Sequence, residues 1–265
     1  MRRLGVSAVL LALPFAAAAC GGGSKSPASS ATSSASAISA IKAAARKTSL
    51  AGSEHMTLNV AGATSGEKLA VKGQGDFDNT QHVGSLHMNF SVSTINSTID
   101  VVLSHNDMYL KSPLFALVLP TGKTWLKLDL SKEAKSQGLN LNTLLSQDPT
   151  KTLSSLQSLR AATVVGTEQV DGVSTTHYRA TIDPSKLPGA TAAGVSQPGV
   201  YNVWVGDDGY VHRMRDQVVT GTGAKKAIVN LTADLSNFGN PVTVTLPPAG
   251  QTATTNGSSI PGLGG

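Results

Sequence analysis

The sequence contains a single cysteine, Cys20, and its position limits the chemistry that its thiol can do. Cys20 follows three alanines at the end of an apolar segment, and Arg2 and Arg3 precede that segment. Basic residues, a short apolar run and then small residues are the pattern of a secretory signal peptide. The apolar run is too short to serve as a permanent transmembrane helix. We therefore expect residues 1–19 to be a signal peptide that is removed.

The residues before Cys20 resemble a bacterial lipobox, in which the cysteine receives a diacylglyceryl group and becomes the new N-terminus. Ala17 stands where the usual lipobox has leucine. The resemblance implies a protein held at the extracytoplasmic face of the cell membrane by acyl chains on Cys20, with no cofactor besides them. Each buried methylene group of such a chain contributes roughly 0.8 kcal/mol to the anchor. The alternative is an ordinary signal peptide, in which Cys20 has no role.

Motifs of enzyme active sites are missing from the sequence or stand in the wrong context. There is no H-E-x-x-H, no G-x-S-x-G, no phosphate-binding loop and no dinucleotide fingerprint. Ser39 and Lys42 match the S-x-x-K pattern formally, but they lie on a predicted helix and no partner motif follows. The six histidines are scattered without the spacing of metal ligands. We therefore expect neither an enzyme nor a metal site.

The charge balance argues against a nucleic-acid partner. The net charge is +5, and it falls to +3 without the leader, which holds two arginines and no acidic residue. Lysine and arginine do not form the clusters that a nucleic-acid-binding surface needs. A mild positive charge is compatible with anionic lipid headgroups at a membrane surface.

Composition divides the mature chain into three parts. Residues 20–36 are rich in Gly and Ser, which predicts a lipidated flexible tether. Residues 249–265 are rich in Gly, Ser, Thr and Pro, which predicts a disordered tail. Residues 37–248 lie between them and are numerous enough for one domain with a sizeable core.

Within this domain the spacing of apolar residues changes from helical to alternating. Residues 37–50 place Ile38, Ile41 and Ala45 at helical spacing, and strands are predicted from residue 55 onward. Gly73 and Gly75 fall on one face of a predicted strand, which suggests a bend or a close approach there.

Further along, helices are predicted at residues 131–145 and 149–160, and strands then continue to residue 246, the last of them at 242–246. Asp171-Gly172 predicts a tight hairpin turn. A sheet of about 10–11 antiparallel strands must curl. We therefore predict an α+β fold, a curved antiparallel half-barrel with helices covering its concave face.

Several motifs resemble the LppX/LprAFG lipoproteins, whose fold is related to the LolA/LolB lipoprotein carriers. The resemblance covers most of the mature chain, and the order and spacing of the motifs carry it. The matching segments are Cys20 with its Gly/Ser tether, 125–128, 148–159, 164–178, 203–206 and 238–242. The resemblance implies a hydrophobic cavity inside a curved sheet, in proteins that move lipids or glycolipids across the cell envelope.

Apolar residues of the predicted strands and helices are candidates for the lining of such a cavity. Plain core packing explains them equally well. The segment at 112–120, bracketed by prolines, either packs on the core or forms a flexible lip at the cavity entrance. The candidate lining residues are Phe77, Leu86, Met88, Phe90, Ile99, Val101, Leu126, Leu128, Leu144, Leu145, Leu153 and Leu156.

We therefore expect a membrane-anchored lipoprotein that binds a lipid or glycolipid and helps to carry it across the envelope. A membrane transporter as a further partner is left open. The alternative is an anchored, non-enzymatic module that holds no ligand and assists envelope assembly through protein partners.

Overall fold

The structure is a computed structural model that describes residues 33–64, 67–130, 153, 156–182, 199–220 and 227–254. The predicted signal peptide, Cys20, nearly all of the tether and the helix predicted at 131–145 lie outside the described residues, as do Leu144 and Leu145. No helix in the described part of the chain is both long and apolar enough to cross a membrane.

The described residues form a helix, a sheet of 12 strands and three short 3₁₀ turns. In chain order the elements are α1 (Ser34–Ser49), β1 (Ser53–Thr64), β2 (Glu67–Asp78), β3 (Val83–Val92), β4 (Ile95–Ser104), β5 (Asp107–Lys111), η1 (Pro113–Leu117), β6 (Trp125–Asp129), η2 (Leu156–Ser158), β7 (Leu159–Val170), β8 (Val173–Ile182), β9 (Gly199–Gly206), β10 (Val211–Thr220), β11 (Ala227–Ser236), η5 (Ala249–Gln251) and β12 (Thr252–Thr254).

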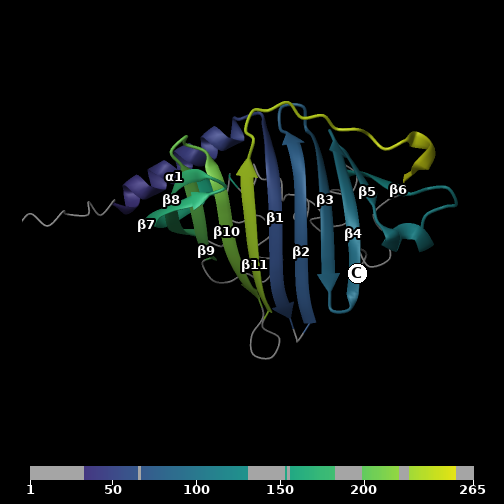
Figure 1. Ribbon diagram of the computed structural model, residues 1–265, viewed down its shortest axis with the longest axis horizontal. Coiled ribbons are helices and arrows are strands. Elements are labelled where there is room, and N and C mark those ends of the chain that lie inside the picture. The colour runs from purple at the N-terminus through teal and green to yellow at the C-terminus, as the bar shows by residue number, and fades with distance from the viewer. Residues whose placement is uncertain are drawn as a thin grey trace, which may run out of the picture. The chain divides into compact units, whose positions relative to one another are not determined.

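All strands belong to one sheet, in the order β12-β6-β5-β4-β3-β2-β1-β11-β10-β9-β8-β7 (Figure 1). Every pair is antiparallel except β12 with β6, which is parallel. The first half of the chain and its last third meet where β1 pairs with β11. Because β12 and β7 stand at opposite edges, the curved sheet does not close. The predicted curved antiparallel sheet is confirmed, with 12 strands rather than 10–11.

Of the helices predicted to cover the concave face, the described residues show one. One α-helix is seen there, α1, and it packs against β7–β10 at one end of the sheet (Figure 1). The apolar face of β3–β6 is not covered by α1. Among the described elements, α1 therefore lies over one half of the sheet and not over the other.

The helix α1 forms because its start is capped and its buried stripe is made of small residues. The Ser33 side chain accepts a hydrogen bond from the Ser36 backbone N–H, which caps the first turn. The helix thus begins at Ser34, three residues before the predicted start at residue 37. Ile41 is fully buried, and small alanines beside it let the helix approach the strands closely. Arg46 and Lys47 in the last turn place positive charge near the negative end of the helix dipole, which stabilises the helix.

Glycines let β2 and β3 approach each other where the sequence predicted it. A β-carbon on Gly75 would lie 2.9 Å from the Cα of Leu86, closer than real side chains allow. Two register positions further along, the ring of Phe77 lies over Gly84, where a β-carbon would meet its Cε1 at 3.0 Å. The close approach predicted for this part of the sheet is confirmed at Gly75.

The hairpin between β7 and β8 has the turn that its sequence predicts. Asp171 has φ 48° and Gly172 has φ 83°, so both turn residues are in the left-handed region, as a type I′ turn requires. Glycine and aspartate tolerate this backbone, and the register of β7 with β8 is fixed from this end.

The predicted helix at 149–160 is wrong at its C-terminal end. Leu156–Ser158 forms a 3₁₀ turn, and β7 already begins at Leu159. The stripe of leucines that suggested a helix is buried all the same, since Leu153, Leu156 and Leu159 pack into the core beneath α1. These leucines are buried whether the backbone forms a helix or a 3₁₀ turn followed by a strand, because burial depends on their apolar side chains.

Two predictions at the C-terminal end are also wrong. The segment 242–246 is extended but pairs with no strand, and it crosses the ends of the strands in Figure 1. The segment after it belongs partly to the fold, because Ala249–Gln251 forms a turn and Thr252–Thr254 pairs with β6. The predicted disordered tail at 249–265 therefore begins too early. Alternating apolar residues predict an extended backbone, but they do not show whether a neighbouring strand is present to pair with it.

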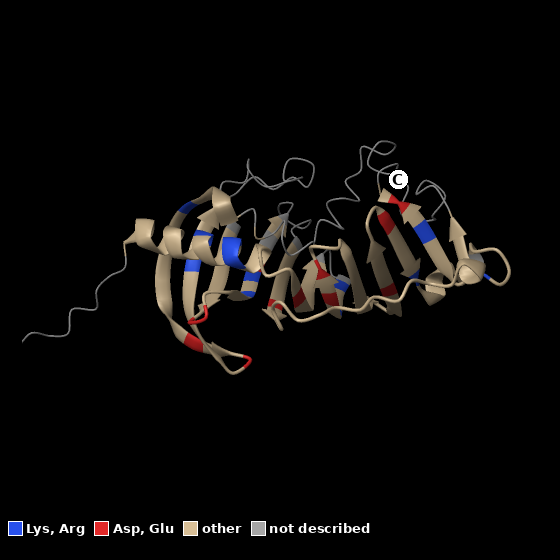
Figure 2. Cartoon of the chain, turned by 90° about the horizontal axis from the view of Figure 1, so that it is seen from above, with Lys and Arg blue, Asp and Glu red and all other residues tan. Residues whose placement is uncertain are grey.

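Acidic and basic residues are interspersed along the strands (Figure 2). Several of them pair across neighbouring strands. Arg213 on β10 donates to both carboxylate oxygens of Asp234 on β11, at 2.5 and 2.8 Å. Lys127 on β6 lies 2.7 Å from Asp107 on β5.

Candidate functional site

Alternation along the central strands gathers apolar side chains on one face of the sheet. Two clusters share this face. The helix cluster lies under α1 and consists of buried residues from α1, β1, β2 and β7–β11, together with Leu153 and Leu156. The β3–β6 cluster has a buried centre formed by Val101, Met108, Leu110, Leu126 and Leu128. Leu86 and Leu103 contact both clusters, so the apolar face is continuous between them.

The structure brings half of the predicted lining residues together in the β3–β6 cluster. Three more belong to the helix cluster, and Phe90 is partly buried on β3. Leu144 and Leu145 lie outside the described residues. The six in the β3–β6 cluster are Leu86, Met88, Ile99, Val101, Leu126 and Leu128, and the three in the helix cluster are Phe77, Leu153 and Leu156.

The β3–β6 cluster is not fully buried. Val101, Leu126 and Leu128 at its centre are buried, whereas Met88 and Ile99 beside them keep part of their surface exposed. In the helix cluster, by contrast, α1 closes over the strands. Apolar surface that the described residues leave open is what a hydrocarbon chain would contact.

The segment bracketed by prolines packs on the core, which is one of the two roles that its sequence left open. It forms the turn η1, in which the Ser112 side chain accepts from the Leu114 N–H at 3.3 Å. Phe115 and Leu119 pack against the β3–β6 cluster. Leu114 and Val118 are 52% and 44% exposed. The segment thus forms an apolar border on this cluster.

A polar pair stands on the same apolar face, between β9 and β10. Tyr201 and Asp216 are cross-strand neighbours, and the Tyr201 hydroxyl donates to the Asp216 carboxylate. Burial raises the pKa of Asp216 to about 6. Burial, and then the adjacent Asp216 charge, also raises the pKa of Tyr201. This pair was not predicted from the sequence. The signal for it is that Met214 and Asp216 stand two residues apart in a strand, which puts a carboxylate on the same face as an apolar side chain.

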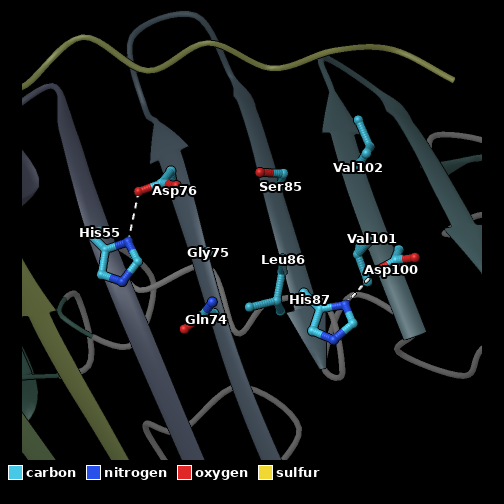
Figure 3. Close-up of a pocket in the computed structure, with 10 residues that line it drawn as sticks. All are labelled: His55, Gln74, Gly75, Asp76, Ser85, Leu86, His87, Asp100, Val101 and Val102. Atoms are coloured by element: carbon cyan, nitrogen blue, oxygen red, sulfur yellow. Dashed lines mark hydrogen bonds and ion pairs between the residues drawn. The ribbon is translucent and has the colours of Figure 1, made fainter. Parts of the chain in front are cut away.

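The opposite face of the sheet is polar and holds a shallow pocket on β1–β4 (Figure 3). Two His–Asp pairs flank it: His55 Nδ1 lies 2.7 Å from Asp76 Oδ1, and His87 Nδ1 lies 2.5 Å from Asp100 Oδ1. The pocket measures about 210 Å³. Pockets that enclose small ligands usually hold about 300–1,000 Å³. This pocket therefore does not suit an acyl chain.

The polar face also explains the motif at 164–178. The Trp204 indole N–H donates to Glu168 at 3.1 Å, which lowers the pKa of Glu168. The His177 ring stacks on Trp204 with centroids 4.1 Å apart, and its Nδ1 contacts Glu168 at 2.9 Å. Tyr178, the next residue, turns to the other face and is buried in the helix cluster. These motif residues hold β7, β8 and β9 together.

The sequence comparison fits this architecture. The sequence model of the LppX_LprAFG lipoproteins matches residues 35–244, from the start of α1 to beyond β11. The chain belongs to the LppX_LprAFG lipoprotein family. No curated protein sequence matches the chain.

Solved structures of two LppX_LprAFG lipoproteins share the fold. LprF from Mycobacterium bovis is 18% identical with a TM-score of 0.54, over 82% of this chain and 99% of LprF. Lipoprotein LppX from Mycobacterium tuberculosis is 17% identical with a TM-score of 0.51, over 80% of this chain and 100% of LppX. Similarity at this level of identity supports a shared fold and no more. The ligand of this LppX_LprAFG lipoprotein therefore has to be inferred from its own residues.

Proposed function

We propose that this protein binds the acyl chains of a lipid or glycolipid on the apolar face of β3–β6 and helps to carry that lipid across the cell envelope. It does so while anchored to the membrane through acyl chains on Cys20. The observation that carries the proposal is the partly open β3–β6 cluster, in which Met88 and Ile99 remain accessible beside a buried centre. Membership of a lipoprotein family supports the anchor.

Hydrocarbon burial is a sufficient driving force for such binding. Each methylene group removed from water contributes about 0.8 kcal/mol. Two sixteen-carbon chains therefore gain on the order of 20 kcal/mol, against a cost of association of about 4–15 kcal/mol. Binding is therefore favourable even when part of each chain stays exposed to water. An open apolar face is sufficient to bind the lipid.

Lipid uptake by purified, delipidated protein tests the proposal. The protein is titrated with a fluorescently labelled phospholipid, and saturable uptake is expected. Native mass spectrometry of protein taken from its own envelope should also show a co-purifying lipid. No saturable uptake and no co-purifying lipid would contradict the proposal and favour a ligand-free module that assists envelope assembly.

A pair of neighbouring substitutions on β3 locates the binding face. Met88 points to the β3–β6 cluster, and Asn89 is exposed on the opposite face. Met88→Asp places a short charge on the apolar face and should weaken uptake at least tenfold, because an unpaired carboxylate is costly beside hydrocarbon. Asn89→Asp adds the same residue to the polar face and should leave uptake unchanged. Equal effects of the two substitutions would place the lipid elsewhere.

A further inference from the structure

The carboxylate of Asp216 is placed where an apolar side chain would be expected. Met214, two residues earlier on β10, is buried in the helix cluster, and strand alternation puts Asp216 on the same face. Its cross-strand neighbours are Tyr201 on β9 and Leu231 on β11. Beyond Tyr201 the next residue in register is Ala180, which is fully buried.

Only part of the Asp216 carboxylate is satisfied. It accepts hydrogen bonds from the Tyr201 hydroxyl and from the backbone N–H of Gln217. Its Oδ1 is buried and has no hydrogen-bond partner. A buried acceptor without a partner costs roughly 1–3 kcal/mol, and more when it is charged. Leucine or valine at this position would avoid that cost, so the carboxylate points to an occupant that the sheet alone does not supply.

This acceptor lies within reach of a lipid bound at the β3–β6 cluster. Four strand spacings separate β3 from β10 along the sheet, which is about 19 Å at 4.8 Å each. One leaflet of a bilayer's hydrocarbon core is about 15 Å thick, so a single lipid with its polar end covers a comparable length. The apolar face is continuous over this distance, because Leu86 and Leu103 join the two clusters.

We infer that Asp216 Oδ1 accepts a hydrogen bond from a hydroxyl group of the bound lipid, so that the ligand is a hydroxylated lipid rather than a purely hydrocarbon or fully esterified one. This inference rests on the proposed function. The hydroxyl belongs either to the headgroup or to an acyl chain, since both present the same donor. Tyr201 holds the carboxylate in place from β9 and is a positioning residue.

Two pairs of neutral probes test the inference and separate the two sources of the hydroxyl. Dipalmitoylglycerol is compared with its 3-O-methyl ether, and methyl 12-hydroxystearate is compared with methyl stearate. Each is measured by displacement of a bound fluorescent lipid. Wild-type protein should prefer the hydroxyl-bearing probe of at least one pair about tenfold or more, as expected for a hydrogen bond to a charged acceptor.

Asp216→Leu should remove this preference while keeping or strengthening binding of the probes without hydroxyl. The variant should fold, because leucine suits the apolar face. Gln217→Leu is the matched control, since Gln217 is the next residue on β10 and is exposed on the opposite face. It should keep the preference.

Three outcomes are distinguishable. Equal binding of both members of each pair by wild-type protein overturns the inference and leaves the proposed function standing. A preference that survives in Asp216→Leu overturns it as well, because another group then binds the hydroxyl. Saturable binding of none of the four probes contradicts the proposed function itself.

Discussion

Gly75 on β2 and Ser85 on β3 lie so close that a β-carbon on Gly75 would overlap the carbonyl oxygen of Ser85. The same β-carbon would be 2.9 Å from the Cα of Leu86. The obstacle is backbone rather than the end of a flexible side chain, so it cannot move aside cheaply. This contact lies between the two faces that matter here, with the β3–β6 cluster on one side and the His–Asp pocket on the other.

Gly75→Ala should therefore destabilise the protein by about 1–3 kcal/mol, the usual cost of forcing an extra carbon into a packed site. Urea denaturation followed by tryptophan fluorescence measures the change. Gly166→Ala is the matched control, because Gly166 also lies in a strand but nothing lies within 4 Å of its added β-carbon. If both substitutions have the same small effect, the close approach of β2 and β3 is not needed for the fold.

A buried hydroxyl fastens α1 to the sheet and gives a second prediction. Thr48 Oγ1 donates to the Ala44 carbonyl and accepts from the Val211 N–H, both at 2.9 Å. Thr48→Val keeps the shape but leaves the Val211 N–H buried without its partner. We expect a loss of about 1–3 kcal/mol in the free energy of unfolding.

Thr48→Ser is the control for this site, because it keeps the hydroxyl and removes only a methyl group. It should cost less than Thr48→Val in the same denaturation experiment. The opposite ranking would mean that the methyl contact, not the hydrogen bond, holds α1 on β10.

The raised pKa of Asp216 predicts an unusual dependence of stability on pH. Burial raises this pKa from 3.8 to about 6, so between these values the folded protein binds a proton that the unfolded chain has released. Stability from this group is therefore present at low pH and is lost as pH rises through about 6. The change is at most about 3 kcal/mol, at 1.36 kcal/mol for each pKa unit.

Comparison of wild-type protein with Asp216→Asn isolates this contribution. Asp78 and Glu168 act in the opposite direction, because hydrogen bonds lower their pKa values, for Asp78 chiefly from Thr80 and for Glu168 chiefly from Trp204. They remain in both proteins. Denaturation at pH 4.5 and pH 7 should show that wild type loses more, or gains less, stability than Asp216→Asn as pH rises. A pH dependence identical in the two proteins would show that Asp216 titrates normally.

The strands and the apolar face were predictable because both follow from alternation. Leu126 and Leu128 lie two residues apart, and this spacing alone puts them on one side of β6. The Asp171-Gly172 turn was equally predictable, since few residues tolerate its backbone. Local sequence is sufficient to predict a feature that depends on a single strand or a single turn.

The remaining features depend on contacts between distant segments. Thr252 pairs with Trp125, across more than a hundred residues, and nothing in the Gly/Pro-rich tail announces that partner. Leu156 looked helical because its leucine neighbours recur at helical spacing, yet this segment forms only a short turn before β7. Asp216 interrupts an apolar pattern in its strand. Its pairing with Tyr201 cannot be predicted without knowing the register of β9 with β10.

The lipid anchor gives the last prediction. We predict that acyl chains are attached to the thiol of Cys20, the single cysteine of the sequence. Cys20→Ser should therefore move the protein from the membrane fraction to the soluble fraction, because each lost acyl methylene removes roughly 0.8 kcal/mol of anchoring. Ser24→Ala in the same Gly/Ser-rich segment is the control and should stay with the membrane. Mass spectrometry of the mature N-terminus should show a diacylglyceryl adduct on wild type and on Ser24→Ala, but not on Cys20→Ser. Membrane retention of the serine variant would mean that another part of the protein, such as the exposed Leu114 and Val118 beside the β3–β6 cluster, holds it at the lipid surface.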